Sequence, residues 1–167
     1  MQISYSTMGF GDRDLGDALQ AIASAGFTEA EISRQPPHAS CPLRGDDLER
    51  FRVLLRECGV NAGTVHAPMR ENVLGAPEGG WRRDKVGVLT DCIRFAADIG
   101  AEGLVVHPVP NPIFVSDHER PELTQVMAEA TRRSLDELVP VAQENGVRML
   151  LENLPYDCHY PFLGMGE

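Results

Sequence analysis

The stretch GVRMLLEN, residues 146–153, decides the fold class. Its apolar run is short and ends in a carboxylate and an amide, and Gly146 and Pro155 bound it. Such a run is typical of a strand buried on both faces. A carboxylate at the end of a buried strand is costly unless it has a partner or a metal ion. The stretch therefore predicts a strand that ends at a polar site.

The same layout occurs three times earlier in the chain, as GFTEAEIS (26–33), GVNAGTVH (59–66) and GAEGLVVH (100–107). Each copy opens with a glycine that ends a helical pattern and continues into a short strand. Seven residues after the four glycines stand Ser33, His66, His107 and Asn153, with Glu152 one residue before the last. Equal offsets along strands direct side chains to one side of a sheet. We therefore expect ligand-type residues to gather at the carboxyl ends of parallel strands, as in an α/β active site.

Helical patterns with one apolar stripe separate these strands. We expect strands near residues 1–10, 28–33, 61–66, 104–106 and 147–151, and helices near 14–25, 46–58, 81–99 and 122–145. Pro140 lies inside the last helical pattern and should distort it. Strands and helices that alternate in this way predict a parallel sheet with helices outside it.

The sheet could be open, as in a doubly wound fold, or it could form part of a barrel. A dinucleotide-binding sheet has a glycine fingerprint after its first strand, and residues 9–11, Gly-Phe-Gly, lack its third glycine. A complete (β/α)₈ barrel takes about 250 residues, whereas this chain has 167. Both alternatives are α/β folds, and as a partial (β/α)₈ TIM barrel the chain would hold about four βα units plus a fifth parallel strand. Residues 1–167 would form a single domain, truncated after that strand.

Composition narrows the classes of partner. The formal net charge is −10, and Lys85 is the single lysine among fifteen basic residues. This balance disfavours nucleic acid, whose binding needs clustered Lys and Arg. The four cysteines have no metal-ligand spacing, and without a signal peptide they indicate a reducing cytoplasm. No apolar stretch is long enough to span a membrane.

Four short motifs carry a resemblance to a known family. They are HAP (66–68), NVL (72–74), VVHP (105–108) and LEN (151–153). In order and in register with the glycine repeat, they resemble the successive strand ends of the xylose isomerase-like TIM barrels. That superfamily includes sugar phosphate isomerases and epimerases as well as endonuclease IV. The resemblance covers nearly the whole chain and is not specific for a substrate.

The resemblance implies roles for individual residues. Glu152 matches a glutamate that binds a divalent metal (Mn, Mg, Co or Zn) and acts as an acid/base. His66 and His107 match zinc ligands in the endonuclease branch and residues lining the substrate pocket in the sugar branch. Glu31 matches a glutamate that faces the pocket, and Asn153 would join it in binding substrate. The remaining ligands of the family come from strands six to eight, so the metal site is expected to be incomplete here.

Three functions remain open at this point. The first is a metal-dependent sugar or sugar-phosphate isomerase or epimerase, either active or an inactive fragment of one, which moves a proton next to a carbonyl with a carboxylate and a divalent cation. The second is an endonuclease IV-like phosphodiesterase. The third is a non-catalytic half-barrel that associates with another chain. Unpaired edge strands favour self-association of this chain, which a stable monomer in sedimentation would contradict.

Each site residue also has a plain structural interpretation. Glu152 and Glu31 could be salt-bridge partners, and the two strand-end histidines could be core residues satisfied by backbone groups. His38, His118 and His159 lie in expected loops, where we expect them to be solvated.

Overall fold

The computed structural model describes residues 3–39, 43–69, 72–108 and 121–152. Strands and helices alternate along the chain, as the repeat predicts. The strands are β1 (Tyr5–Ser6), β2 (Glu29–Ser33), β3 (Asn61–His66), β4 (Gly103–Val106) and β5 (Arg148–Leu151). The helices are the 3-10 turn η1 (Thr7–Phe10), α1 (Leu15–Ser24), α2 (Asp46–Cys58), α3 (Gly79–Asp98) and α4 (Pro121–Glu144).

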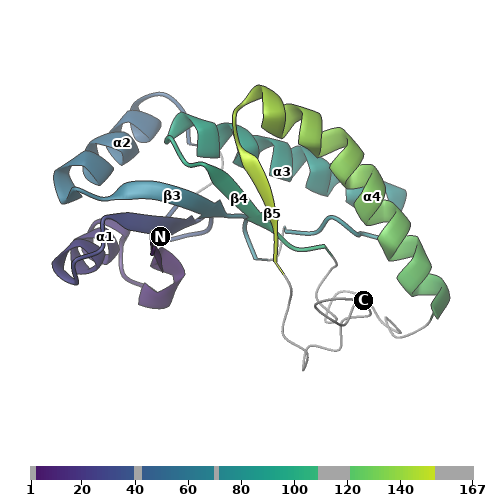
Figure 1. Ribbon diagram of the computed structural model, residues 1–167, viewed down its shortest axis with the longest axis horizontal. Helices are drawn as coiled ribbons and strands as arrows, with labels where there is room; N and C mark the ends of the chain where they lie inside the picture. Colours follow the sequence, from purple (N-terminus) through teal and green to yellow (C-terminus); the bar gives the residue numbers. More distant parts are fainter. Residues whose placement is uncertain (1–2, 40–42, 70–71, 109–120, 153–167) are drawn as a thin grey trace.

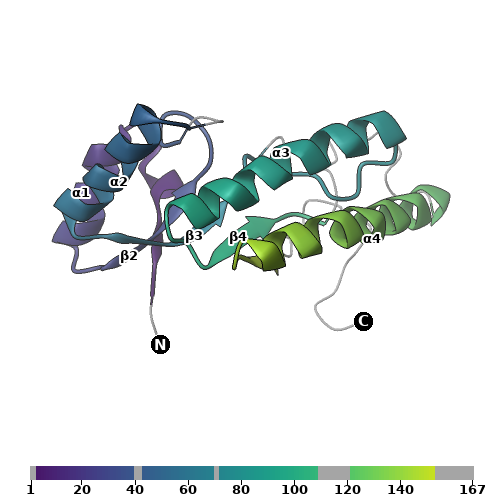
Figure 2. The same ribbon diagram turned by 90° about the horizontal axis from the view of Figure 1, so that it is seen from above.

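The sheet has the strand order β1-β2-β3-β4-β5, and every neighbouring pair is parallel. Figure 1 shows α2, α3 and α4 arching over one side of the curved sheet, and Figure 2 shows α3 and α4 lying side by side. A doubly wound sheet reverses its strand order at a switch point, and this sheet does not. Its sequential order is that of a (β/α)₈ barrel, so the described residues form part of one.

The core lies between the sheet and its covering helices. Alternate residues of the central strands, such as Ile32, Val65 and Leu104, have no exposed surface. They belong to one apolar cluster with the helix residues Leu19, Ile22, Leu89, Ile93 and Leu138. Burial of one such side chain contributes about 1.5–3 kcal/mol. This layer therefore fixes the strands, and with them the residues at the strand ends.

The four glycines of the repeat all adopt the left-handed backbone conformation. Their φ angles are 88° at Gly26, 65° at Gly59, 78° at Gly100 and 68° at Gly146. A residue with a Cβ is strained there, which explains glycine at each helix end. The prediction that each glycine ends a helix and leads into a strand is confirmed.

The N-terminal strand is shorter than predicted. From Ile3 onward, where the structure describes this segment, only Tyr5 and Ser6 pair with β2, because the Ser6 hydroxyl oxygen accepts the Met8 N–H at 3.3 Å and starts a 3-10 turn. At the other end of the chain, α4 continues through Pro140 for four residues.

The expectation for His38 was wrong. This residue is buried, 5% exposed, because a turn after β2, closed by a 3.0 Å bond from the His38 N–H to the Gln35 carbonyl, folds the segment inward. His118 and His159 lie outside the described residues.

Two strands end the sheet. Within the described ranges, β1 pairs only with β2, and β5 only with β4. Leu151 on β5 is 53% exposed. Among the helices that the structure describes, none combines the length and the apolar character needed to cross a membrane.

Candidate metal centre

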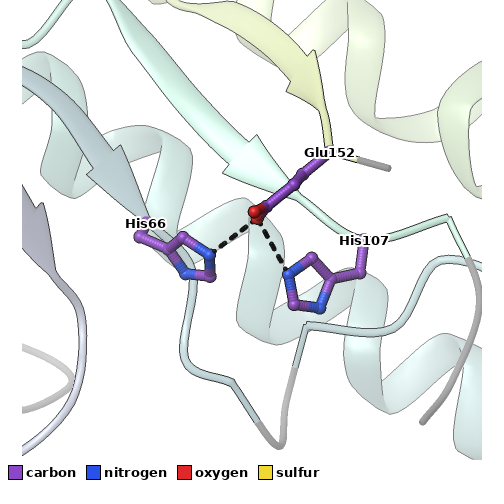
Figure 3. Close-up of side chains that lie close together, drawn as sticks. All are labelled: His66, His107 and Glu152. Atoms are coloured by element: carbon purple, nitrogen blue, oxygen red, sulfur yellow. Dashed lines mark hydrogen bonds and ion pairs between the residues drawn. The ribbon is translucent and has the colours of Figure 1, made fainter. Parts of the chain in front are cut away.

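Three polar side chains meet at the carboxyl ends of β3, β4 and β5 (Figure 3). His66 is the last residue of β3, His107 follows β4 directly, and Glu152 follows β5 directly. The register explains their meeting, because His66 pairs with Val105 and Val105 pairs with Leu150. Positions 107 and 152 therefore come two residues later on the same face of the sheet.

One carboxylate oxygen contacts both imidazoles. Oε2 of Glu152 lies 3.0 Å from Nε2 of His66 and 3.1 Å from Nε2 of His107. The two rings pack edge to face, with centroids 5.3 Å apart. One ligand atom from each of the three residues lies within 4.8 Å of the others. The sequence placed these three residues at one end of the sheet, and the structure brings them together.

The hydrogen bonding of His66 determines which ring nitrogen carries the hydrogen when the imidazole is neutral. Its Nδ1 lies 2.7 Å from the carbonyl oxygen of Ala67. A carbonyl oxygen only accepts, so Nδ1 carries the hydrogen. In the neutral ring Nε2 then has a lone pair, and it faces a carboxylate oxygen that also only accepts. A proton or a metal cation between the two atoms is needed to make this contact favourable.

The cluster is buried on one side and open on the other. The side chains of His66 and His107 are 7% and 5% exposed, whereas that of Glu152 is 45% exposed. Burial lowers the pKa of His107 and the neighbouring His66 lowers it further, while Glu152 acts in the opposite direction. His107 is therefore neutral at pH 7, the form that binds metals. The exposed carboxylate is the member that a small molecule can reach.

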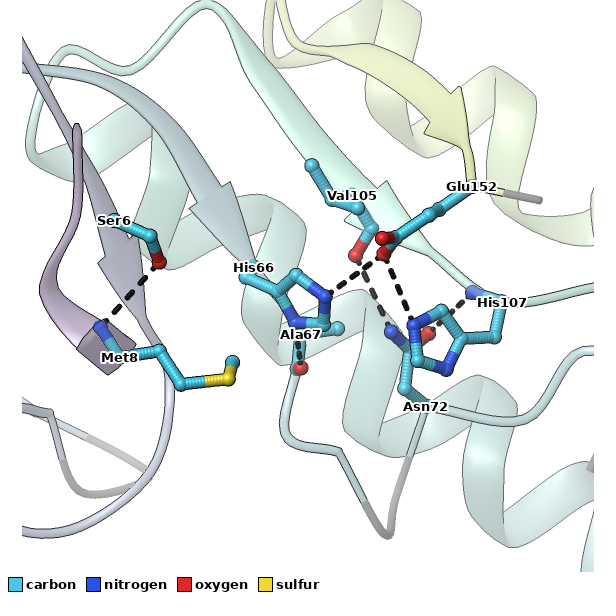
Figure 4. Close-up of polar contacts among 8 residues, drawn as sticks. All are labelled: Ser6, Met8, His66, Ala67, Asn72, Val105, His107 and Glu152. Atoms are coloured by element: carbon cyan, nitrogen blue, oxygen red, sulfur yellow. Dashed lines mark hydrogen bonds and ion pairs between the residues drawn. The ribbon is translucent and has the colours of Figure 1, made fainter. Parts of the chain in front are cut away.

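A buried amide supports the backbone of the site (Figure 4). The Asn72 Oδ1 accepts the N–H of His107 at 2.8 Å, and its Nδ2 donates to the carbonyl of Val105 at 3.4 Å. The sequence places Asn72 in a loop and gives it no role. Its approach to His107 depends on the fold of a loop, which neither strand nor helix periodicity reveals.

Glu31 and Asn153 are the two further residues predicted to bind substrate. Glu31 lies in β2 and is half-buried. It pairs with Thr64, two residues before the pair formed by Ser33 and His66. The structure does not bring it into the cluster of His66, His107 and Glu152. Asn153 lies outside the described residues.

A hollow of about 1000 Å³ opens at the other end of the strands. Its lining includes Glu102, Arg148 and Arg52. These charges are already paired, since Arg148 contacts Glu102 at 2.7 Å and Arg52 contacts Asp98 at 3.6 Å. The hollow contains none of the strand-end histidines, and we assign it no chemistry.

The three side chains fit a divalent transition metal. Two imidazole nitrogens and one carboxylate oxygen are the ligand set of several catalytic zinc and iron sites. Bonds of about 2.0–2.2 Å place two ligands of one ion at most about 4.3 Å apart. The separations of 3.0 and 3.1 Å from Glu152 lie within that limit, while the three ligand atoms together lie within 4.8 Å of one another. A metal cation, like a proton, would satisfy the contact between His66 Nε2 and the Glu152 carboxylate, in which a neutral imidazole leaves two acceptors facing each other.

The described residues thus define a parallel α/β half-barrel with a group of metal-binding type at the carboxyl ends of its strands. The family model for the xylose isomerase-like TIM barrel matches residues 19–163. The chain belongs to this family, and its fold is a partial TIM barrel.

Individual proteins are similar to nearly the whole of this chain. Uncharacterized protein MJ1311 of Methanocaldococcus jannaschii is 24% identical over 155 residues, which cover 93% of this chain and 50% of that protein. A D-tagatose 3-epimerase-like protein has a TM-score of 0.72 and 23% identity, over 93% of this chain and 54% of that structure. D-psicose 3-epimerase with D-tagatose from Clostridium cellulolyticum H10 has a TM-score of 0.74 and 19% identity, over 95% and 55%. The chain thus spans about half the length of the proteins it matches.

Proposed function

We propose that this chain carries part of the active site of a metal-dependent sugar or sugar-phosphate isomerase or epimerase. The observation that carries the proposal is the Glu152 carboxylate, which contacts the Nε2 atoms of His66 and His107 at 3.0 and 3.1 Å. Family membership supports it. Two structures with the same fold are named as D-psicose 3-epimerase and as a D-tagatose 3-epimerase-like protein. Their names make small ketoses the first substrates to test.

Glu152 suits the proton-transfer step. Isomerisation and epimerisation both remove a proton from a carbon beside a carbonyl, and a positioned carboxylate can accept it. The Glu152 side chain is exposed enough to meet a substrate, while the two histidines beneath it are buried. A divalent ion, when bound, supplies Lewis-acid stabilisation of the charge that develops on the carbonyl oxygen.

The ligand atoms favour some metals over others. Mg²⁺ prefers oxygen ligands, whereas imidazole suits Zn²⁺ and other transition metals. Two of the three ligands here are imidazoles. We therefore propose that this half of the site prefers Zn²⁺, Co²⁺ or Mn²⁺ to Mg²⁺.

Phosphodiester hydrolysis is the second candidate. Both histidines direct Nε2 at Glu152, which suits the role of zinc ligands that the resemblance to the endonuclease IV branch implies. The net charge of −10 opposes tight binding to a polyanion. Duplex DNA is therefore the less favoured substrate.

Solvent deuterium exchange tests the proposal. The chain, loaded with Mn²⁺, Co²⁺ or Zn²⁺, would be incubated in D₂O with ketohexoses, ketopentoses and their phosphates, and NMR would follow deuterium at the carbon beside the carbonyl. We expect exchange by the wild type and a loss of about 10²- to 10⁴-fold in Glu152→Gln. Glu102→Gln removes an exposed carboxylate at the other end of the strands and should leave exchange unchanged.

Two outcomes would change the assignment. A metal-loaded chain that exchanges no sugar proton would contradict proton transfer by this half of the site alone. Cleavage of duplex DNA at abasic sites by the same preparation would instead support the phosphodiesterase.

A further inference from the structure

The backbone around His107 is held at three successive points. Its N–H donates to the Asn72 Oδ1 at 2.8 Å, and its carbonyl accepts the Leu74 N–H at 3.3 Å. The next carbonyl, of Pro108, accepts the hydroxyl of Thr131 at 2.7 Å. His107 lies beyond the last residue of β4, so these contacts replace the sheet pairing that holds residues within a strand.

Asn72 is the polar side chain at the centre of this arrangement. It is 1% exposed, and Figure 4 shows it beside His107 and the end of β4. The Val105 carbonyl to which it donates also accepts the Ala67 N–H at 3.1 Å. The Ala67 carbonyl in turn contacts the ring of His66. Asn72 therefore joins the backbone segments that carry both histidines.

Helix α4 holds the loop segment in place. The Ser134 hydroxyl donates to the Leu74 carbonyl at 2.7 Å, and Thr131, three residues earlier on the same helix face, reaches Pro108. The two segments approach so closely that a Cβ on Gly75 would lie 2.6 Å from the Pro108 carbonyl oxygen and from the Thr131 hydroxyl. A small shift of the loop would therefore move His107.

We propose that Asn72 is a positioning residue for the metal centre, through which the loop after β3 sets the position of the His107 imidazole. The inference rests on the proposed metal-dependent function. An ion tolerates ligand displacements of only about 0.2 Å. Partners that orient a ligand typically change metal affinity by about 10- to 100-fold when they are lost.

Cobalt titration of the full chain tests the inference. Co²⁺ binding would be followed by visible absorption for the wild type, Asn72→Ala and Asn145→Ala. The last is a matched control, because the Asn145 amide also donates to a backbone carbonyl, that of Val141 at 2.8 Å, but lies at the end of α4. We expect Co²⁺ affinity to fall about 10- to 100-fold in Asn72→Ala and to stay unchanged in Asn145→Ala.

A second readout separates positioning from general stability. Amide hydrogen exchange of the metal-free chain should be faster at His107 in Asn72→Ala, while Leu104 within β4 keeps its protection. Ser134→Ala serves if Asn72→Ala does not fold. It loosens the same loop from α4, and we expect a severalfold loss of Co²⁺ affinity.

The outcomes distinguish the inference from the function on which it rests. A folded wild-type chain that binds no Co²⁺ would overturn both. If the wild type binds Co²⁺ and folded Asn72→Ala binds it with the same affinity, only the positioning role is overturned. If Asn72→Ala does not fold, unchanged Co²⁺ affinity in Ser134→Ala overturns that role instead.

Discussion

At the scale of single residues, Glu152 and Glu102 show how surroundings give one carboxylate a different role from another. Glu102 is exposed and pairs with exposed Arg148, a contact worth at most about 1 kcal/mol. Glu152 contacts two buried imidazoles, and one of these presents a lone pair in its neutral form. Chain position already separates the two carboxylates, because Glu102 precedes β4 whereas Glu152 follows β5. The neighbouring side chains then give Glu152 its different role.

The lowered pKa of His107 predicts a pH dependence of stability in the metal-free chain. A histidine in an unfolded chain titrates near pH 6.5, and burial and His66 lower the pKa in the folded state. As the pH falls through about 6.5, the unfolded state takes up the proton first, so the free energy of unfolding decreases. Above about pH 7, His107 is neutral in both states and contributes no slope.

Urea unfolding from pH 8 to pH 5 measures this effect. We expect His107→Gln to lose part of the decline in unfolding free energy below about pH 6.5, because glutamine does not titrate. Identical pH slopes for this variant and the wild type would contradict a lowered pKa at His107.

At the scale of the elements, the glycine repeat correctly predicted where the strands begin. It predicted only in part which strand-end residues lie side by side. Ser33 and His66 stand at equal offsets and are paired in β2 and β3. His66, however, pairs with Val105, so His107 lies two residues farther along the same face. Side-chain parity explains why the cluster still forms. Strand register depends on tertiary packing, which an offset along the sequence does not contain.

The same register explains why Glu152 faces the histidines. The pairs of β4 and β5 place position 152 across from His107, so the carboxylate, one residue short of the repeat offset, faces the histidines. Asn72 stands in one of the motifs that carry the family resemblance, but its contact with the end of β4 could not be predicted from the sequence. It lies after β3, outside the regular elements, and the sequence shows no periodic pattern that would place its amide against β4.

The contact between the loop after β3 and α4 predicts a strong effect of one methyl group. Gly75→Ala would place a Cβ 2.6 Å from two oxygens, and such overpacking typically costs about 1–3 kcal/mol. Gly87→Ala is the matched control, because Gly87 lies in α3 and its Cβ would meet nothing within 4 Å. It should stabilise the chain by about 0.5–1 kcal/mol through helix propensity.

Urea denaturation of both variants checks the two signs. A Gly75→Ala protein as stable as the wild type would contradict the close approach of the loop to α4.

At the scale of the whole molecule, the alternation of strands and helices predicted a parallel α/β sheet, and the missing glycine fingerprint together with the family resemblance favoured a partial barrel. The strand order and the family match confirm that prediction. The described sheet ends at β1 and β5, and the chain covers about half of the proteins it resembles. Self-association of this chain remains a prediction. The resemblance predicts further ligands on strands six to eight. The activity of the complete site is therefore a proposal as well.

The central claim is that His66, His107 and Glu152 form a metal centre within this chain. Calorimetric titration with Zn²⁺ and Co²⁺ of the wild type, Glu152→Gln and Glu102→Gln tests it most directly. The account predicts that each wild-type chain binds one ion and that Glu102→Gln binds it with unchanged affinity. Binding by Glu152→Gln should be at least about 100-fold weaker, because losing a ligand should matter no less than losing a partner that orients one. A folded wild type that binds neither ion, or equal affinities in the two variants, would contradict it.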